Sequence, residues 1–104
     1  MSTEKLTEQQ IADAELSGWV NQQGSLQTRI RTGDFETGLA VVNAIGATAG
    51  EMNHHPDLDL RYTYVAIRLS SHDVGGLTER DVRLARAIGD IAANAGLALT
   101  TTDD

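Results

Sequence analysis

The sequence contains no cysteine and a single proline among its 104 residues. The lack of cysteine excludes disulfide scaffolds, thiolate metal sites and cysteine nucleophiles, and it fits a reducing compartment such as the cytoplasm. No apolar run approaches the roughly 20 residues needed to span a bilayer. Residues 1–7 lack the basic-then-apolar order of a signal peptide. We therefore expect a cytoplasmic protein that does not insert into a membrane.

Positive charge is also scarce, because eight Lys and Arg residues face fifteen Asp and Glu residues, for a formal net charge of −7. The arginines are spread along the chain, so no basic patch is available to a phosphate backbone, and nucleic-acid binding is not expected. Hydrophobic residues make up 40% of the chain, which favours a folded protein over a disordered one. A single domain over residues 1–104 is expected, because two domains would each bury too little apolar surface.

Two helices are predicted by capping boxes, in which a Ser or Thr side chain and a residue three positions later bond to each other's backbone amides. The first box, Thr7–Gln10, starts a helix that we expect to run to about Ser17 and to stop at Gly18. The second box, Thr78–Asp81, starts a helix over residues 79–94.

Strands are indicated where apolar residues occupy alternate positions. Such alternation covers Leu26–Arg31, and Gln22–Gly24 before it is typical of a hairpin turn. Between Leu58 and Leu69 the alternation changes phase near Tyr64, which predicts two strand pieces separated by a bulge or kink. Residues 100–104 are expected to form a loose polar tail.

Another helix is predicted between these strands, because apolar residues from Phe35 to Ala49 recur at helical spacing. It must end before Pro56, since the residue preceding a proline is disfavoured in a helix. The order along the chain is thus helix, hairpin, helix, two strand pieces, helix. This order predicts an α+β domain of two layers, with the helices on one face of a four-stranded antiparallel sheet.

The three histidines lie in two short segments, His54-His55-Pro56 and Ser70-Ser71-His72-Asp73. Adjacent histidines after a helix are most simply C-terminal capping groups, because a cation there meets the negative end of the helix dipole. Histidine also exchanges protons near neutral pH, so clustered histidines indicate acid–base chemistry. The residues alone leave both interpretations open.

Three motifs in this order resemble the pterin-4a-carbinolamine dehydratase family: His-His-Pro at 54–56, Leu-Ser-Ser-His at 69–72 and Gly-Gly-Leu-Thr-Glu-Arg-Asp at 75–81. The spacing from His54 to His72 and on to Asp81 fits the family pattern without a gap, and the resemblance extends over nearly the whole chain. It implies a hydro-lyase that removes water from a 4a-hydroxytetrahydropterin with no metal or other cofactor. It also implies a homodimer or a dimer of dimers.

The resemblance assigns roles to individual residues. His54 and His72 are the candidate general acids, and His55 is a candidate binding group or base. Candidates for binding the edge of the pterin ring are Ser70, Ser71 and Asp73. Candidates for a supporting role are Glu51, Asn53 and Asp81. For Asp81 we place structure ahead of catalysis, because its position in a capping box is already a sufficient reason for its presence.

Three positions depart from the usual family pattern: Gly50 replaces an acidic residue, Asn53 an aspartate and Leu58 an aromatic residue. These departures leave open an alternative function, in which a catalytically weak or inactive member acts as a protein-interaction or assembly module. A zinc or iron site made by the histidines is disfavoured, because adjacent residues such as His54 and His55 point apart in an extended chain.

Overall fold

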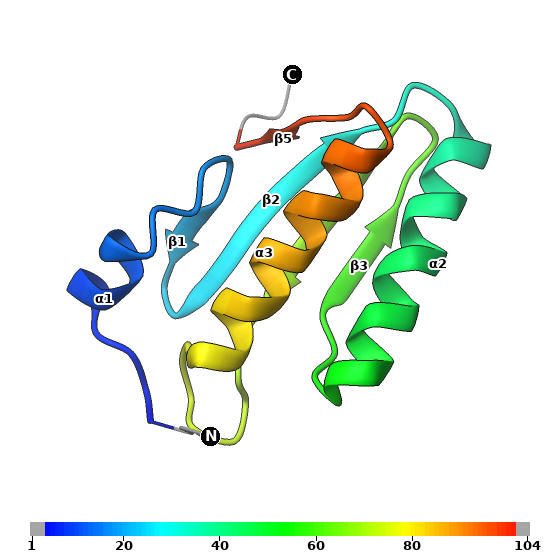
Figure 1. Ribbon diagram of the computed structural model, residues 1–104. Coiled ribbons are helices and arrows are strands. Elements are labelled where there is room, and N and C mark those ends of the chain that lie inside the picture. Colours follow the sequence, from blue (N-terminus) through cyan, green and yellow to red (C-terminus); the bar gives the residue numbers. More distant parts are fainter. Residues whose placement is uncertain (1–3, 102–104) are drawn as a thin grey trace.

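The computed structural model describes residues 4–101 and shows an antiparallel sheet lying behind two long helices (Figure 1). The main strands are β1 (Val20–Gln22), β2 (Ser25–Arg31), β3 (Asp57–Leu60) and β4 (Tyr64–Leu69), in the spatial order β1-β2-β4-β3. A short strand, β5 (Leu99–Thr100), also pairs with β2. The predicted α+β architecture with four main strands is therefore confirmed. Within residues 4–101, no helix is long and apolar enough to cross a membrane.

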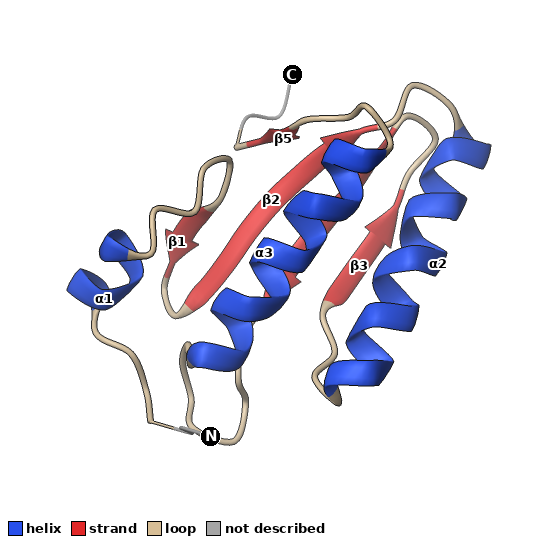
Figure 2. Ribbon diagram, in the orientation of Figure 1, coloured by secondary structure: helices blue, strands red, loops and turns tan. Residues whose placement is uncertain are grey.

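The helices of the described chain are α1 (Glu8–Asp13), α2 (Phe35–Met52) and α3 (Glu79–Asn94). Both long helices, α2 and α3, cover the same face of the sheet, whereas α1 lies beyond β1 (Figure 2). The capping box at Thr78 is present, and α3 has the predicted bounds. The opposite face of the sheet is not covered by any described helix.

The helix α1 is shorter than predicted, because the chain leaves the helical conformation at Glu15, where φ is 52°. Gly18 is therefore not the residue that ends it. Gly18 has a φ of 85°, and a Cβ atom at this position would lie only 2.6 Å from the Cβ of Leu99. The glycine is required because β5 packs against this point of the chain.

The core lies between the helices and one face of the sheet. The buried residues of β4 are Val65, Ile67 and Leu69, which alternate along the strand as predicted. The buried positions of α2 and α3 that contribute to the same cluster include Val41, Ile45, Leu84 and Ile88. Full burial of each such side chain contributes roughly 1.5–3 kcal/mol relative to exposure. This shared core fixes the ends of α2, α3 and β4 relative to one another.

The change of phase near Tyr64 marks a reversal of the chain, so the predicted bulge is wrong. The strands β3 and β4 pair antiparallel, with Leu58 opposite Ile67. Residues 61–63 connect them, and the amide of Arg61 donates to the carbonyl oxygen of Tyr64 at 2.8 Å. The connection contains no Gly, Asn, Asp or Pro, the residues that usually identify a turn.

The predicted turn at Gln22–Gly24 is confirmed. Gln23 and Gly24 have φ values of 51° and 83°, as a tight turn between two twisted strands requires. At the other end of the chain, the predicted tail is wrong for Thr100, which belongs to β5. Residues 102–104 of that tail lie outside the described part of the chain.

Candidate active site

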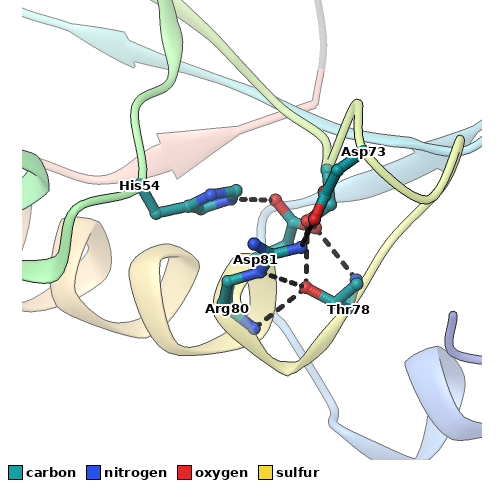
Figure 3. Close-up of polar contacts among 6 residues, drawn as sticks. His54, Asp73, Thr78, Arg80 and Asp81 are labelled. Atoms are coloured by element: carbon teal, nitrogen blue, oxygen red, sulfur yellow. Dashed lines mark hydrogen bonds and ion pairs between the residues drawn. The ribbon is translucent and has the colours of Figure 1, made fainter. Parts of the chain in front are cut away.

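The end of α2 positions His54. Asn53 follows the helix in the left-handed conformation, with a φ of 52°. The amide of His54 donates to the carbonyl oxygen of Ala49 at 3.1 Å, and the amide of Asn53 donates to that of Gly50 at 3.2 Å. This pair of bonds is the Schellman ending of a helix, and asparagine suits it because it tolerates the left-handed region. The chain leaves α2 so that the His54 side chain points toward α3 (Figure 3).

His54 contacts Asp81, which lies in the first turn of α3. The Nε2 atom of His54 is 2.6 Å from Oδ1 of Asp81. The His54 side chain is 10% exposed and that of Asp81 is fully buried. This contact joins two elements that are 27 residues apart in the sequence. His54 is therefore held by a carboxylate and is more than a solvent-exposed cap of α2.

The second carboxylate oxygen of Asp81, Oδ2, accepts two other hydrogen bonds. The hydroxyl of Ser71 donates to it at 2.7 Å and the amide of Thr78 at 2.9 Å. The bond from Thr78 belongs to the capping box that the sequence predicts. A carboxylate has about four lone-pair positions, so capping leaves part of its capacity unused. Asp81 thus starts α3 and holds His54 at the same time.

Ser71 and Thr78 extend this network beyond Asp81. Their hydroxyl oxygens are 2.9 Å apart, and both side chains are buried. The amide and the Nε of Arg80 both lie 3.2 Å from Oγ1 of Thr78. Among the described residues, every buried side-chain nitrogen and oxygen has a hydrogen-bond partner. Because an unsatisfied buried group costs about 1–3 kcal/mol, the complete network stabilises the site. From the sequence, Thr78 is predicted only to cap α3.

The loop after β4 lies beside the network and is held at two points. Ser71 and Gly76 form an isolated antiparallel bridge across its base. Nη2 of Arg80 donates to both carboxylate oxygens of Asp73. The hydrogen bond from Arg80 is the main cause of a lowered pKa for Asp73, and the charges of Arg80 and His54 lower that pKa further. Asp73, a predicted pterin-binding residue, is thus already bonded to α3.

The other two histidines are exposed, in contrast to His54. His55 follows His54 directly and lies in the connection between α2 and β3. His72 follows Ser71 in the loop after β4, where its carbonyl oxygen accepts the amide of Gly75. Both exposed histidines are therefore sequence neighbours of residues in the buried network.

In the described part of the chain, the remaining candidates, Ser70 and Glu51, have no hydrogen bond or ion pair to the network. Ser70 is half-buried at the end of β4, and Glu51 is exposed in the last turn of α2. Leu58, where the family usually has an aromatic residue, is half-buried on β3. Within residues 4–101, no three His, Asp or Glu side chains are grouped so that they could hold a metal ion.

A groove of about 580 Å³ lies on the uncovered face of the sheet. Its charged and amide-bearing lining residues are Gln22, Gln27, Arg29, Asp57, Asp59 and Arg68. None of the three histidines lines it. The buried network around His54 and Asp81 is therefore a separate site, at the end of the sheet where α2 stops and α3 starts.

Comparison with known families gives one match over most of the chain. A family model described as pterin 4 alpha carbinolamine dehydratase matches residues 4–91. A protein of Nocardia farcinica is 37% identical over 94 residues, which cover 88% of this chain and 99% of the relative. A protein of Mycobacterium tuberculosis is 39% identical over 85 residues, which cover 80% of this chain and 90% of the relative. Both relatives are provisionally named pterin-4-alpha-carbinolamine dehydratase.

Several solved structures are similar to this one, among them two whose descriptions contain the words pterin dehydratase. The crystal structure of a transcriptional coactivator/pterin dehydratase from Brucella melitensis has a TM-score of 0.82 at 28% identity, with 86% of this chain and 99% of that chain covered. A pterin dehydratase-like protein, described as a RuBisCO assembly factor in the alpha-carboxysome, has a TM-score of 0.62 at 25% identity. Its alignment covers 71% of this chain and 88% of that chain.

Proposed function

Because this chain belongs to the pterin-4a-carbinolamine dehydratase family, we propose that it converts a 4a-hydroxytetrahydropterin to a quinonoid dihydropterin and water. In this reaction the bond from C4a to the hydroxyl oxygen breaks, a proton is delivered to the departing hydroxyl, and a proton is removed from a ring nitrogen. Histidine suits both transfers because it exchanges protons near neutral pH. The pterin loses only water, so the reaction needs neither an oxidant nor a reductant.

The contact between His54 and Asp81 is the observation that carries this proposal. A buried carboxylate 2.6 Å from an imidazole nitrogen orients the ring and selects its tautomer, which is how acid–base catalysts hold a working histidine. A histidine that served only to cap α2 would need no such partner. The low exposure of His54 also favours a specific role over a surface charge.

The roles of the individual residues follow the family. His54 and His72 are the proposed general acids, and His55 binds the ring or acts as a base. Residues proposed to hold the edge of the pterin are Ser70, Ser71 and Asp73. The bond between Asp73 and Arg80 supports a further duty for Asp73, which is to keep the His72 loop in place.

We also propose that the protein is a homodimer or a dimer of dimers. Two features support self-association. Phe35 and Leu39 of α2 are 43% and 44% exposed, and large exposed apolar side chains on one helix favour an interface. The strand β3 ends the order of the sheet, so one edge of it has no partner strand within residues 4–101. The molar mass of the purified protein in sedimentation equilibrium tests this proposal.

A role as an assembly or interaction module is the alternative. The structural relative from the alpha-carboxysome is described as an assembly factor, and the exposed apolar residues of α2 favour a surface of this kind. A dehydratase assay with purified protein and a 4a-hydroxytetrahydropterin separates the two functions. We expect water loss well above the uncatalysed rate, and a matched His54→Gln/His72→Ala protein serves as the control. A rate equal to the uncatalysed rate would favour the assembly module.

A further inference from the structure

We infer that the buried hydroxyls of Ser71 and Thr78 are positioning residues, which act through Asp81 to make Nδ1 of His54 the nitrogen that exchanges protons with the substrate. The catalytic consequence rests on the proposed dehydratase function. The assignment of the imidazole tautomer does not, because it follows from hydrogen bonds within the protein.

The direction of each hydrogen bond in the network can be derived from the chemistry of its members. Arg80 has only donors, so Oγ1 of Thr78 accepts from its amide and from its Nε. Asp81, as a carboxylate, has only acceptors, so the hydroxyl of Ser71 donates to its Oδ2. Ser71 has no second proton, and the contact between the two hydroxyls must therefore be donated by Thr78. All protons in this chain of bonds point toward Asp81.

The same reasoning fixes the tautomer of His54. Oδ1 of Asp81 can only accept, so Nε2 of His54 carries the proton in their contact. In a neutral imidazole the other nitrogen, Nδ1, is then without a proton. It takes one up to form the imidazolium, and this is the proton that His54 delivers as a general acid. Among residues 4–101, none forms a hydrogen bond with Nδ1. Since no buried side-chain nitrogen in the described chain lacks a partner, Nδ1 must be accessible.

The two hydroxyls matter because they hold the carboxylate that holds the ring. Without the Ser71 hydroxyl, Oδ2 keeps only the amide of Thr78, and the Thr78 hydroxyl loses its acceptor. The carboxylate of Asp81 is then freer to rotate, and His54 is freer to adopt the other tautomer. Both hydroxyls are engaged in bonds within the protein, so Ser71 holds the pterin edge through its backbone, and the loss should appear in kcat and much less in KM. At metal sites, loss of a group that orients a ligating histidine costs about 10-fold to 100-fold, and we expect a loss of this order here.

The test compares Ser71→Ala and Thr78→Val with matched substitutions elsewhere in the core. Ser25→Ala and Thr28→Val remove the same atoms from buried residues whose hydroxyls bond to backbone carbonyl oxygens near the β1–β2 hairpin. Thr78→Ser retains the hydroxyl and is expected to retain activity. Circular dichroism identifies the variants that fold. If Thr78→Val does not fold, Ser71→Ala alone tests the inference.

Two readouts are needed: steady-state kinetics and the ¹⁵N chemical shifts of the His54 ring. We expect the neutral ring of the parent protein to be protonated at Nε2. Ser71→Ala and Thr78→Val should increase the Nδ1-protonated fraction and lower kcat about 10-fold to 100-fold, whereas the two core controls should change neither. A parent ring protonated at Nδ1, or a Ser71→Ala protein with unchanged tautomer and kcat, would overturn the inference. Absence of activity in the parent would refute the proposed function instead, and the ¹⁵N shifts would still test the tautomer.

Discussion

Nη2 of Arg80 donates to both carboxylate oxygens of Asp73, at 2.8 and 3.1 Å, and so joins the first turn of α3 to the loop that carries His72. The Nε of the same guanidinium reaches Thr78, so one side chain contacts both the exposed loop and the buried network. Asp73 is largely exposed, and exposed ion pairs contribute little to global stability. We therefore expect this contact to order the loop that carries His72 and to change the free energy of unfolding of the whole protein very little.

Replacing Arg80 by Met should raise the pKa of Asp73 toward its ordinary value of 3.8, because the hydrogen bond from Arg80 is the main cause of the lowered pKa. Because the pKa of Asp73 is lowered in the folded protein, the contact with Arg80 stabilises the fold at pH values above the ordinary pKa of 3.8. This stabilisation is lost as the pH falls through the lowered pKa. Loop amides of the parent should therefore lose protection only in strong acid. Carboxyl ¹³C titration measures the shift, with Arg86→Met on the same helix as control. An unchanged titration of Asp73 in Arg80→Met would contradict this assignment.

Removal of either proposed general acid should slow dehydration by about 10² to 10⁴, which corresponds to roughly 3–5 kcal/mol of barrier. His72→Ala tests the exposed acid without loss of buried contacts. For His54, Gln is the better replacement, because its amide still donates to Asp81 whereas Ala would leave Oδ1 without a donor. His55→Ala should weaken substrate binding at least as much as it lowers turnover.

Steady-state kinetics, circular dichroism and melting temperature of the three histidine variants check this prediction. If His54→Gln and His72→Ala both turn over at the parent rate, the histidines are not the catalytic groups, and the interaction module becomes the preferred function.

The purified protein should contain no stoichiometric metal and should keep its activity in a chelator. Nε2 of His54 is already bonded to Asp81, and the described part of the chain has no group of three ligands arranged for a metal ion. Elemental analysis and an assay after dialysis against chelator check this expectation. About one tightly bound zinc or iron per chain, with activity lost on its removal, would disprove a cofactor-free reaction.

Gly50→Glu should leave activity unchanged or raise it, because it restores the acidic residue that the family usually has here. Gly50 is exposed, and a Cβ atom at this position would meet nothing within 4 Å. The neighbouring Glu51 cannot replace it, since one residue along a helix turns the side chain by about 100°. Gly50→Ala is the matched control, because it adds the roughly 0.5–1 kcal/mol of helix stability without the carboxylate. Collapse of activity in a folded Gly50→Glu protein would show that the motif is aligned incorrectly.

The sequence correctly predicted those elements whose boundaries are set by residues close together in the chain. The helix α3 starts at Thr78 as expected, because a capping box acts within four residues. The helix α1 was predicted too long, since Gly18 is needed for the approach of Leu99 and not for a helix end. The strand β5 was missed because two residues that pair across the sheet carry no local periodicity.

The sequence predicted which residues belong to the candidate site but not the hydrogen bonds that join them. The motifs identified His54 and Asp81, yet their contact spans 27 residues and depends on how α2 and α3 pack. The capping box accounted for one oxygen of Asp81, and the sequence offered no partner for the other. Ser71 was expected at the pterin edge, and its bond to Asp81 follows only from the tertiary arrangement.

The two duties of Asp81 affect how related sequences should be interpreted. One carboxylate oxygen caps α3 and the other holds the histidine, so selection for a stable fold preserves this aspartate even in a descendant that has no pterin to dehydrate. Its presence in a homologue is therefore weak evidence of activity. The exposed His55 and His72 have no comparable structural duty, and drift should remove them first once catalysis is no longer selected. The exposed pair, more than the buried aspartate, should distinguish working enzymes from relatives recruited to other tasks.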